Sequence, residues 1–232
     1  MSVASDAWFK FMESAEGGLS LDPNDSGNYY HGLLIGSNLG LTGADMAVWL
    51  NREPTAADMA DITSASAKPI AMALYWQAMM CPAMWGAVAF SVCDFGYNAG
   101  VGESARVLQS IVGTEPDGWI GPKTIAAIVA LNRASLIMMA HNLSPSAAQP
   151  VQRRLGLTPD GLVGPLTQAA LAKCLDGPAL ILAARLADAQ GDVYRSFAQF
   201  PRYGRGWLNR TADRLAAAIA LTAPQPMIGK HP

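Results

Sequence analysis

The chain has 232 residues and a formal net charge of -2, and 51% of its residues are hydrophobic while 15% are charged. This length and composition fit one compact domain or two small ones, and they exclude a disordered chain. They also exclude a nucleic-acid-binding protein of the uniformly basic kind. The charge is nevertheless uneven, because residues 1–100 carry three Lys or Arg against ten Asp or Glu, and residues 101–232 carry thirteen against eight. The basic second part suits an anionic polymer.

The cysteines and histidines predict neither a metal site nor a set of disulfides. Cys81, Cys93 and Cys174 are odd in number and match no zinc or redox motif, and the three histidines are scattered. We therefore expect buried free thiols, no metal and no cofactor. The first ten residues lack the basic segment and apolar run of a secretory signal, so we expect synthesis in the cytoplasm.

The first predicted helix covers residues 5–16. Ser5 is its expected cap, and Gly17-Gly18 is expected to end it with a left-handed residue. Glu16 then lies in the last turn, where the helix dipole disfavours a negative charge. A carboxyl biased toward its protonated form suits a general acid, and an exposed surface glutamate is the alternative.

Residues 19–42 are rich in Gly, Asn, Asp and Ser, which predicts turns or a short hairpin. Asp22 and Asp25 follow Glu16 by six and nine residues, so this loop can fold a second carboxylate back toward the first. Two carboxyls beside a cleft are the minimum equipment for hydrolysis of a glycosidic bond. Two acids near a loop are also common on any protein surface.

The rest of the chain predicts helices. Residues 69–93 are long and uncharged enough for a membrane span, but Pro82 and Gly86 interrupt them, which favours two buried helices and no stable membrane insertion. The fold class is therefore mainly α, with at most a small β-hairpin within 19–42. The expected helices cover residues 5–16, 43–51, 55–63, 69–80, 83–97, 102–113, 122–140, 148–155, 165–174, 178–199 and 207–221. Residues 222–232 are expected to form a loose end.

An internal repeat relates residues 108–129 to residues 151–172 at an offset of 43. Both copies read Q-x-x-x-G-x-x-P-D-G-x-x-G-P-x-T, which predicts a short helix, an Asp-Gly turn and a second helix opened by Gly-Pro. The copies either bind a ligand or are folding units whose turn residues have a purely structural purpose.

The last third of the chain combines arginine with aromatic residues. Six arginines and five aromatic residues lie within residues 185–214. Such a mixture suits the carboxylates and sugars of an anionic glycan polymer, and it also suits a solvated helix face.

Three separated motifs resemble those of glycoside hydrolase family 108, the bacterial and phage N-acetylmuramidases. The first motif has E-G-G at 16–18, D-P-N-D-S-G at 22–27 and G-S-N-L-G-L-T at 36–42; the others are D-F-G-Y-N-A-G at 94–100 and G-W-L-N-R at 206–210. Leu19 stands where the family usually has an aromatic residue, and residues 28–35 look inserted. The resemblance implies a lysozyme-like helical muramidase domain over residues 1–101 and a helical peptidoglycan-binding region, including the repeat, over residues 102–232.

The resemblance also implies roles for single residues. Glu16 would be the general acid, Asp25 would position or activate water or stabilise the transition state, and Ser37 would orient that water. The residues expected to bind substrate are Asn98, Tyr30, Tyr75, Asp117, Asp160, Trp207 and Arg210. For Asn98 the alternative is a helix C-cap, and the neighbouring Trp76 is expected in the core.

These observations predict a hydrolase that cleaves the β-1,4 bond between N-acetylmuramic acid and N-acetylglucosamine. Its expected partner is peptidoglycan, without nucleic acid, and it is expected to be a monomer. It would act on the wall in the periplasm after release or delivery, as a phage endolysin or a delivered lytic protein. The alternative is a catalytically silent wall-binding or phage-tail protein that retains the lysozyme-like fold.

Overall fold

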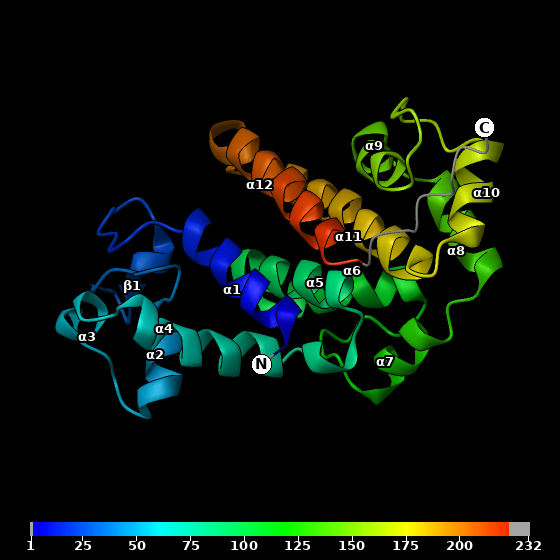
Figure 1. Ribbon diagram of the computed structural model, residues 1–232. Coiled ribbons are helices and arrows are strands. Elements are labelled where there is room, and N and C mark those ends of the chain that lie inside the picture. The colour runs from blue at the N-terminus through cyan, green and yellow to red at the C-terminus, as the bar shows by residue number, and fades with distance from the viewer. Residues whose placement is uncertain (1, 223–232) are drawn as a thin grey trace.

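The computed structural model describes residues 2–222, which form a mainly helical protein with one two-stranded antiparallel sheet (Figure 1). The helices are α1 (Val3–Ala15), α2 (Gly43–Leu50), α3 (Ala56–Ala60), α4 (Ser64–Ala71), α5 (Gly86–Ala99), α6 (Val101–Val112), α7 (Pro122–Val129), α8 (Arg133–His141), α9 (Pro145–Arg154), α10 (Pro165–Lys173), α11 (Gly177–Ser196) and α12 (Phe200–Ala220). The shorter elements are two 3-10 turns, η1 (Ser26–Asn28) and η3 (Cys81–Ala83), a π-helix, η2 (Met72–Gln77), and the strands β1 (Tyr29–Tyr30) and β2 (Leu33–Leu34). The predicted fold class is confirmed. Of the expected loose end, residues 223–232 lie outside the described residues.

Helix α5 is the centre of the molecule. Residues 87–97 of this helix are all buried, and it packs against α1, α6, α11 and α12 (Figure 1). A helix that is apolar all round must be covered on every side, and burying one side chain such as Phe90 contributes about 2–3 kcal/mol. The buried core runs from Trp8 to Ile219, so it draws on both ends of the chain. Asp94 is the charged residue in this helix, and burial at 0% exposure requires it to have partners.

The first helix differs from its prediction at both ends. Its cap is Ser2 rather than Ser5, because the Ser2 hydroxyl accepts a hydrogen bond from the Ser5 backbone N–H at 3.2 Å. The helix ends at Ala15, and Glu16 already has extended backbone with φ -90° and ψ 144°. Neither Gly17 nor Gly18 has positive φ, so the predicted left-handed ending is wrong. Glu16 therefore lies just outside the helix, where the dipole argument carries less weight.

The predicted hairpin within residues 19–42 is confirmed. Tyr29 pairs with Leu34 and Tyr30 with Leu33, and the two turn residues His31 and Gly32 both have positive φ. Two consecutive positive φ values are typical of the type I′ turn that matches the twist of the strands.

Three predicted helices have other bounds in the structure. The one expected over residues 122–140 divides into α7 and α8, because Asn132 caps a new helix by accepting from the Ser135 N–H at 3.0 Å. The one expected over 69–80 begins at Ser64, after a capping box at Thr63, and continues into η2. At the C-terminal end, α12 begins at Phe200, seven residues earlier than the predicted helix.

In the part of the chain that the structure describes, no single helix is long and apolar enough to cross a membrane. One bent pair, α7 with residues 134–141, meets the criterion by length and composition, at an angle of 92°.

Candidate active site

Glu16 meets a residue from the other end of the chain. Its carboxylate accepts from the guanidinium of Arg210 on α12, with an Nη1–Oε1 distance of 2.5 Å. The side chain of Glu16 is 20% exposed and that of Arg210 is 15% exposed. Helix α12 reaches Glu16 because it packs along both α1 and α5. The expected general acid is thus partly open to solvent and paired with a cation.

Arg210 belongs to a chain of four alternating charges that runs from the surface into the core. Its opposite edge donates to Asp94 of α5, from Nη2 to Oδ1 at 2.9 Å and from Nε to Oδ2 at 3.4 Å. Beyond Asp94 lies Arg214, whose Nη1 is 3.9 Å from Oδ2. Exposure falls along the series, from 20% at Glu16 to 0% at Asp94 and 1% at Arg214. The four charges sum to zero, so each is balanced by a neighbour in a poorly hydrated place.

The electrostatics of this chain follow from burial and pairing. Burial alone would lower the pKa of Arg210, but the negative charges of Asp94 and Glu16 raise it above its usual value. For Arg214 burial dominates over Asp94 and lowers the pKa. Within residues 2–222, none of the three side-chain nitrogens of Arg214 has a hydrogen-bond partner. Arg210 is therefore firmly cationic at every pH at which the protein would work.

The loop at residues 38–41 closes on Glu16 from the other side. Gly40 has φ +77°, and a Cβ there would lie 2.4 Å from the Tyr97 ring and 3.0 Å from the Glu16 carboxyl carbon. The Tyr97 hydroxyl donates to the Leu39 carbonyl at 2.6 Å, which fixes this loop on α5. Burial, and next the charge of Glu16, raise the pKa of Tyr97. Tyr97 thus remains a neutral donor beside the carboxylate.

The second candidate carboxylate lies in a hydrogen-bonded loop. Asp25 is exposed, and its Oδ1 accepts from the Gly27 N–H at 2.9 Å at the start of η1. Ser37 is half-buried, and its hydroxyl donates to Oδ1 of Asn28 at 2.7 Å. Asn28 is itself buried and donates to Ser20 Oγ and the Asp22 carbonyl, each at 3.0 Å. The structure therefore joins Ser37 to the loop that carries Asp25.

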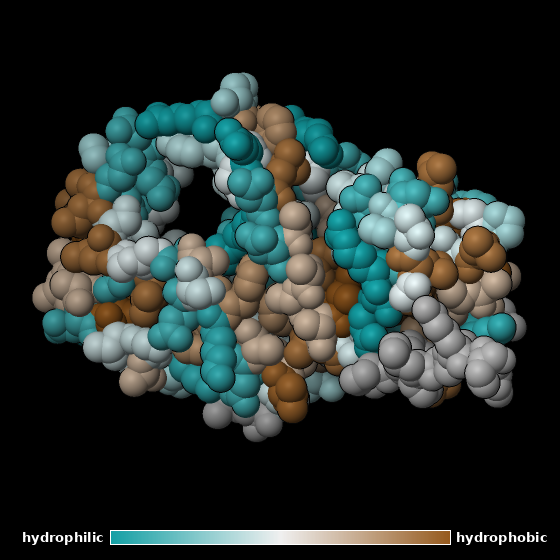
Figure 2. Space-filling model, turned by 45° about the horizontal axis from the view of Figure 1, so that its top comes forward, coloured by the Kyte–Doolittle hydropathy of each residue, from teal (hydrophilic) through white to brown (hydrophobic). Residues whose placement is uncertain are grey.

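This loop and the beginning of α12 come near one another. Hydrogen bonds from Asn24 lower the pKa of Asp22, and the charge of Arg202 on α12 adds to the effect. Figure 2 shows a deep hollow on this side of the molecule, with hydrophilic residues around much of its rim. A hollow with a hydrophilic rim is the kind of place that a glycan chain can enter.

The sequence of the N-terminal part agrees with a known family. Residues 9–100 match the glycosyl hydrolase 108 family. This segment is a glycosyl hydrolase 108 domain. None of the curated proteins matches the chain.

The fold extends the likeness to the C-terminal part. A solved structure described as that of Brucella abortus SagA matches with a TM-score of 0.64 at 22% sequence identity, and the match covers 94% of each chain. At this identity the likeness shows that the two chains share a fold.

The predicted substrate-binding residues of the glycosyl hydrolase 108 domain lie in different environments. Tyr30 is half-buried and stacks on His31, with ring centroids 4.2 Å apart. Tyr75 is 9% exposed and donates to Asp45 at 2.8 Å, so its ring offers little surface to a sugar. Asn98 is exposed, and its amide donates to the Asp94 carbonyl at 2.8 Å. Trp76, expected in the core, is 2% exposed.

Trp207 and Arg210, which were both predicted to bind substrate, lie among different neighbours. Trp207 is half-buried in an aromatic group with Tyr194, Phe197 and Tyr203. Arg210 instead faces Glu16 of the glycosyl hydrolase 108 domain.

The repeat forms two copies of one hydrogen-bonded unit. Gln109 Nε2 donates to Asp117 Oδ1 at 2.7 Å, and its Oε1 accepts from the Gly118 N–H. Gln152 makes the same bonds to Asp160, at 2.6 Å, and to the Gly161 N–H. The hydrogen bonds of each aspartate are therefore explained within its own turn. The identities that define the repeat have a structural purpose, and wall binding by Asp117 and Asp160 stays a prediction.

Sequence reasoning missed two members of the charge chain, Asp94 and Arg214. The signal for Asp94 was a charged residue in an otherwise apolar helix. The signal for Arg214 was its spacing of four residues from Arg210, which places both on one face of a helix. No local sequence pattern indicated that either residue lies near Glu16.

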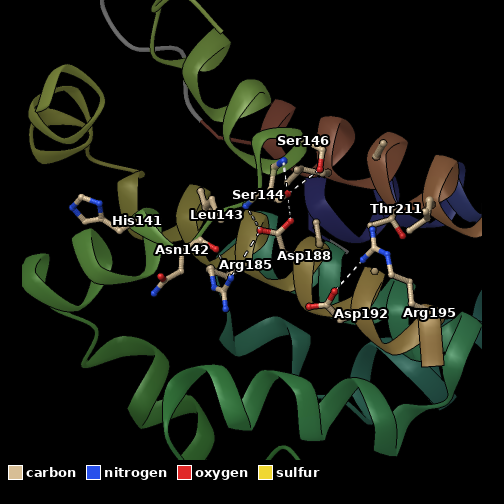
Figure 3. A pocket seen from close by; sticks show the side chains of 16 residues that line it. His141, Asn142, Leu143, Ser144, Ser146, Arg185, Asp188, Asp192, Arg195 and Thr211 are labelled. Atoms are coloured by element: carbon tan, nitrogen blue, oxygen red, sulfur yellow. Dashed lines mark hydrogen bonds and ion pairs between the residues drawn. The ribbon is translucent and has the colours of Figure 1, made fainter. Parts of the chain in front are cut away.

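A separate cavity of about 570 Å³ lies between the α8–α9 junction, α11 and α12 (Figure 3). Asp188 there accepts from the Ser144 N–H at 2.8 Å, and Arg195 pairs with Asp192 at 3.0 Å. The charges in its wall thus satisfy one another, and no predicted site residue lines it.

Metal-site geometry is not found among residues 2–222, where no three His, Cys, Asp or Glu side chains gather. Cys81, Cys93 and Cys174 are buried, as predicted, and none of the three forms a disulfide within residues 2–222.

Proposed function

We propose that this chain cleaves the β-1,4 bond between N-acetylmuramic acid and N-acetylglucosamine in peptidoglycan, with Glu16 as the general acid. The observation that carries the proposal is the partly exposed carboxyl of Glu16, within a glycosyl hydrolase 108 domain and held in place by Arg210 of α12. A protonated Glu16 would give its proton to the glycosidic oxygen as the bond breaks.

Asp25 is the proposed second carboxylate. It lies on the loop that follows Glu16, and its Oδ2 has no part in the bond to Gly27. That oxygen would orient or deprotonate the attacking water, or stabilise positive charge on the sugar ring. Ser37, joined to the same loop through Asn28, would help to hold the water.

The proposed place of action is the cell wall, in the periplasm after release or delivery, as for a phage endolysin or a delivered lytic protein. The basic C-terminal part would favour association with the anionic wall.

The test is hydrolysis of purified Gram-negative peptidoglycan by the wild-type protein and by Glu16→Gln, with mass spectrometry of the fragments. We expect reducing muramic-acid ends from the wild type, and a loss of about 10²–10⁴-fold in Glu16→Gln. Glu13→Gln is the matched control, because Glu13 lies in the last turn of α1, three residues before Glu16. If no protein cleaves the wall while all of them pellet with it, the fold is a wall-binding one without catalysis.

A further inference from the structure

The pairing of Glu16 poses a chemical problem for a general acid. A carboxyl must carry a proton in order to donate it, whereas a cation within hydrogen-bonding distance favours the ionised form. The 2.5 Å contact with Arg210 orients the side chain of Glu16 and places a cation beside its carboxyl. In the free protein, Glu16 and Arg210 form an ion pair.

The two partners of this contact are not equally free to move. Arg210 is anchored at its other edge by two hydrogen bonds to Asp94, which is fully buried. Glu16 has extended backbone after the end of α1, and a Cβ at Gly17 or Gly18 would meet nothing within 4 Å. Glu16 can thus leave the pair by a local rotation. Movement of Arg210 would instead take away the two hydrogen bonds that it donates to the buried carboxylate of Asp94.

We propose that Arg210 is a positioning residue that holds Glu16 ionised and oriented in the free enzyme, and that Glu16 leaves it when a glycan binds. Protonation then accompanies substrate binding, since displacing water from around a carboxyl favours its neutral form. This inference rests on the proposed function of Glu16.

Other ionisable groups on the neighbouring elements also belong in the account. From α5 these are Tyr97, which is neutral, and Asp94, whose charge Arg210 and Arg214 balance. Asp45 lies behind Tyr97, and Asp22 and Asp25 lie on the following loop. The aspartates are anions and favour the protonated carboxyl, so Arg210 is the group among them that opposes protonation.

The first measurement follows the Glu16 carboxyl directly in the full-length chain. Proteins with ¹³C-labelled glutamate are titrated by NMR, and the Glu16 signal is assigned by its absence in Glu16→Gln. We expect the titration midpoint to rise by about one pH unit or more in Arg210→Gln, and to stay near the wild-type value in Arg210→Lys. Arg205→Gln, a change on the same helix, controls for net charge and should leave the midpoint unchanged. An unchanged midpoint in Arg210→Gln overturns the proposal.

The second measurement connects the pair with turnover. Rates on dye-labelled peptidoglycan at sub-saturating concentration are compared across pH, because this regime reports the free enzyme. In the pH–rate profile of Arg210→Gln, we expect the alkaline limb, where the rate falls as the general acid loses its proton, to move to higher pH. A purely structural role of Arg210 would instead lower the rate equally at every pH, and that result would overturn the proposal. Addition of soluble glycan fragments to the labelled wild type should raise the midpoint. Lack of hydrolysis by the wild type contradicts the proposed function. Hydrolysis with the same alkaline limb in the wild type and Arg210→Gln contradicts only the role of Arg210.

Discussion

The carboxylate of Asp94 and the guanidinium of Arg210 form an ion pair of 2.9 Å, although 116 residues separate them in the chain. One of them lies in the glycosyl hydrolase 108 domain and the other in the region beyond it. Because Arg210 also contacts Glu16, the C-terminal helix α12 contributes to the surroundings of the proposed acid. The N-terminal and C-terminal regions, to which the sequence assigned separate roles, therefore meet at the carboxyl of Glu16.

Removal of the Asp94 carboxylate should strongly destabilise the fold. In Asp94→Ala, the fully buried Arg214 loses its anionic partner and Arg210 loses one of its two, and breaking a buried pair in this way costs about 3–5 kcal/mol. Urea unfolding of the wild type and the variant measures this difference. Asp192→Ala removes one partner of an exposed pair on α11 and should change the free energy of unfolding little. Equal losses in the two variants would contradict the account of the charge chain.

Gly40→Ala should damage both stability and hydrolysis. Its Cβ would lie 2.4 Å from the Tyr97 ring and 3.0 Å from the Glu16 carboxyl carbon, so one of these groups must move. Gly32→Ala is the matched control, because Gly32 has a similar φ of +81° with nothing within 4 Å of a Cβ. Backbone strain alone costs on the order of 1–2 kcal/mol at either position. We expect thermal unfolding to show a larger loss for Gly40→Ala, and hydrolysis of the wall to fall in that variant alone.

Much of the helical architecture was predictable, since apolar spacing and cap residues are local signals. The hairpin, the buried thiols and the buried Trp76 follow from the same kind of reasoning. The division of residues 122–140 was also within reach, because Asn132 is a good N-cap in mid-segment. The contact between Glu16 and Arg210 was not, because it depends on how α12 packs over α1 and α5. Periodicity reports which face of a helix is buried and not which helix covers it.

The two glutamines of the repeat should matter more than their polar character suggests. Gln109 and Gln152 are each buried, and each bonds to an aspartate, a glycine N–H and a threonine hydroxyl in its own copy. Substitution of either by Ala leaves buried partners unsatisfied, which costs about 1–3 kcal/mol. Chemical unfolding should give similar losses for the two variants. Ser110→Ala, an exposed change beside Gln109, serves as the control and should be near neutral.

The turn aspartates of the repeat should make stability depend on acid pH. Hydrogen bonds lower the pKa of both carboxyls, chiefly from Gln109 for Asp117 and from the Leu162 N–H for Asp160. Because the folded-state pKa is below the unfolded value of about 3.9, their contribution is present above that value and is lost as pH falls through the folded-state pKa. The double variant Asp117→Asn, Asp160→Asn keeps an acceptor oxygen at each turn but cannot titrate. We therefore expect thermal unfolding midpoints of the wild type and the double variant to differ at pH 5 and to converge toward pH 2. A difference that stays constant over this range would show that hydrogen bonding to the ionised carboxylates does not stabilise the repeat.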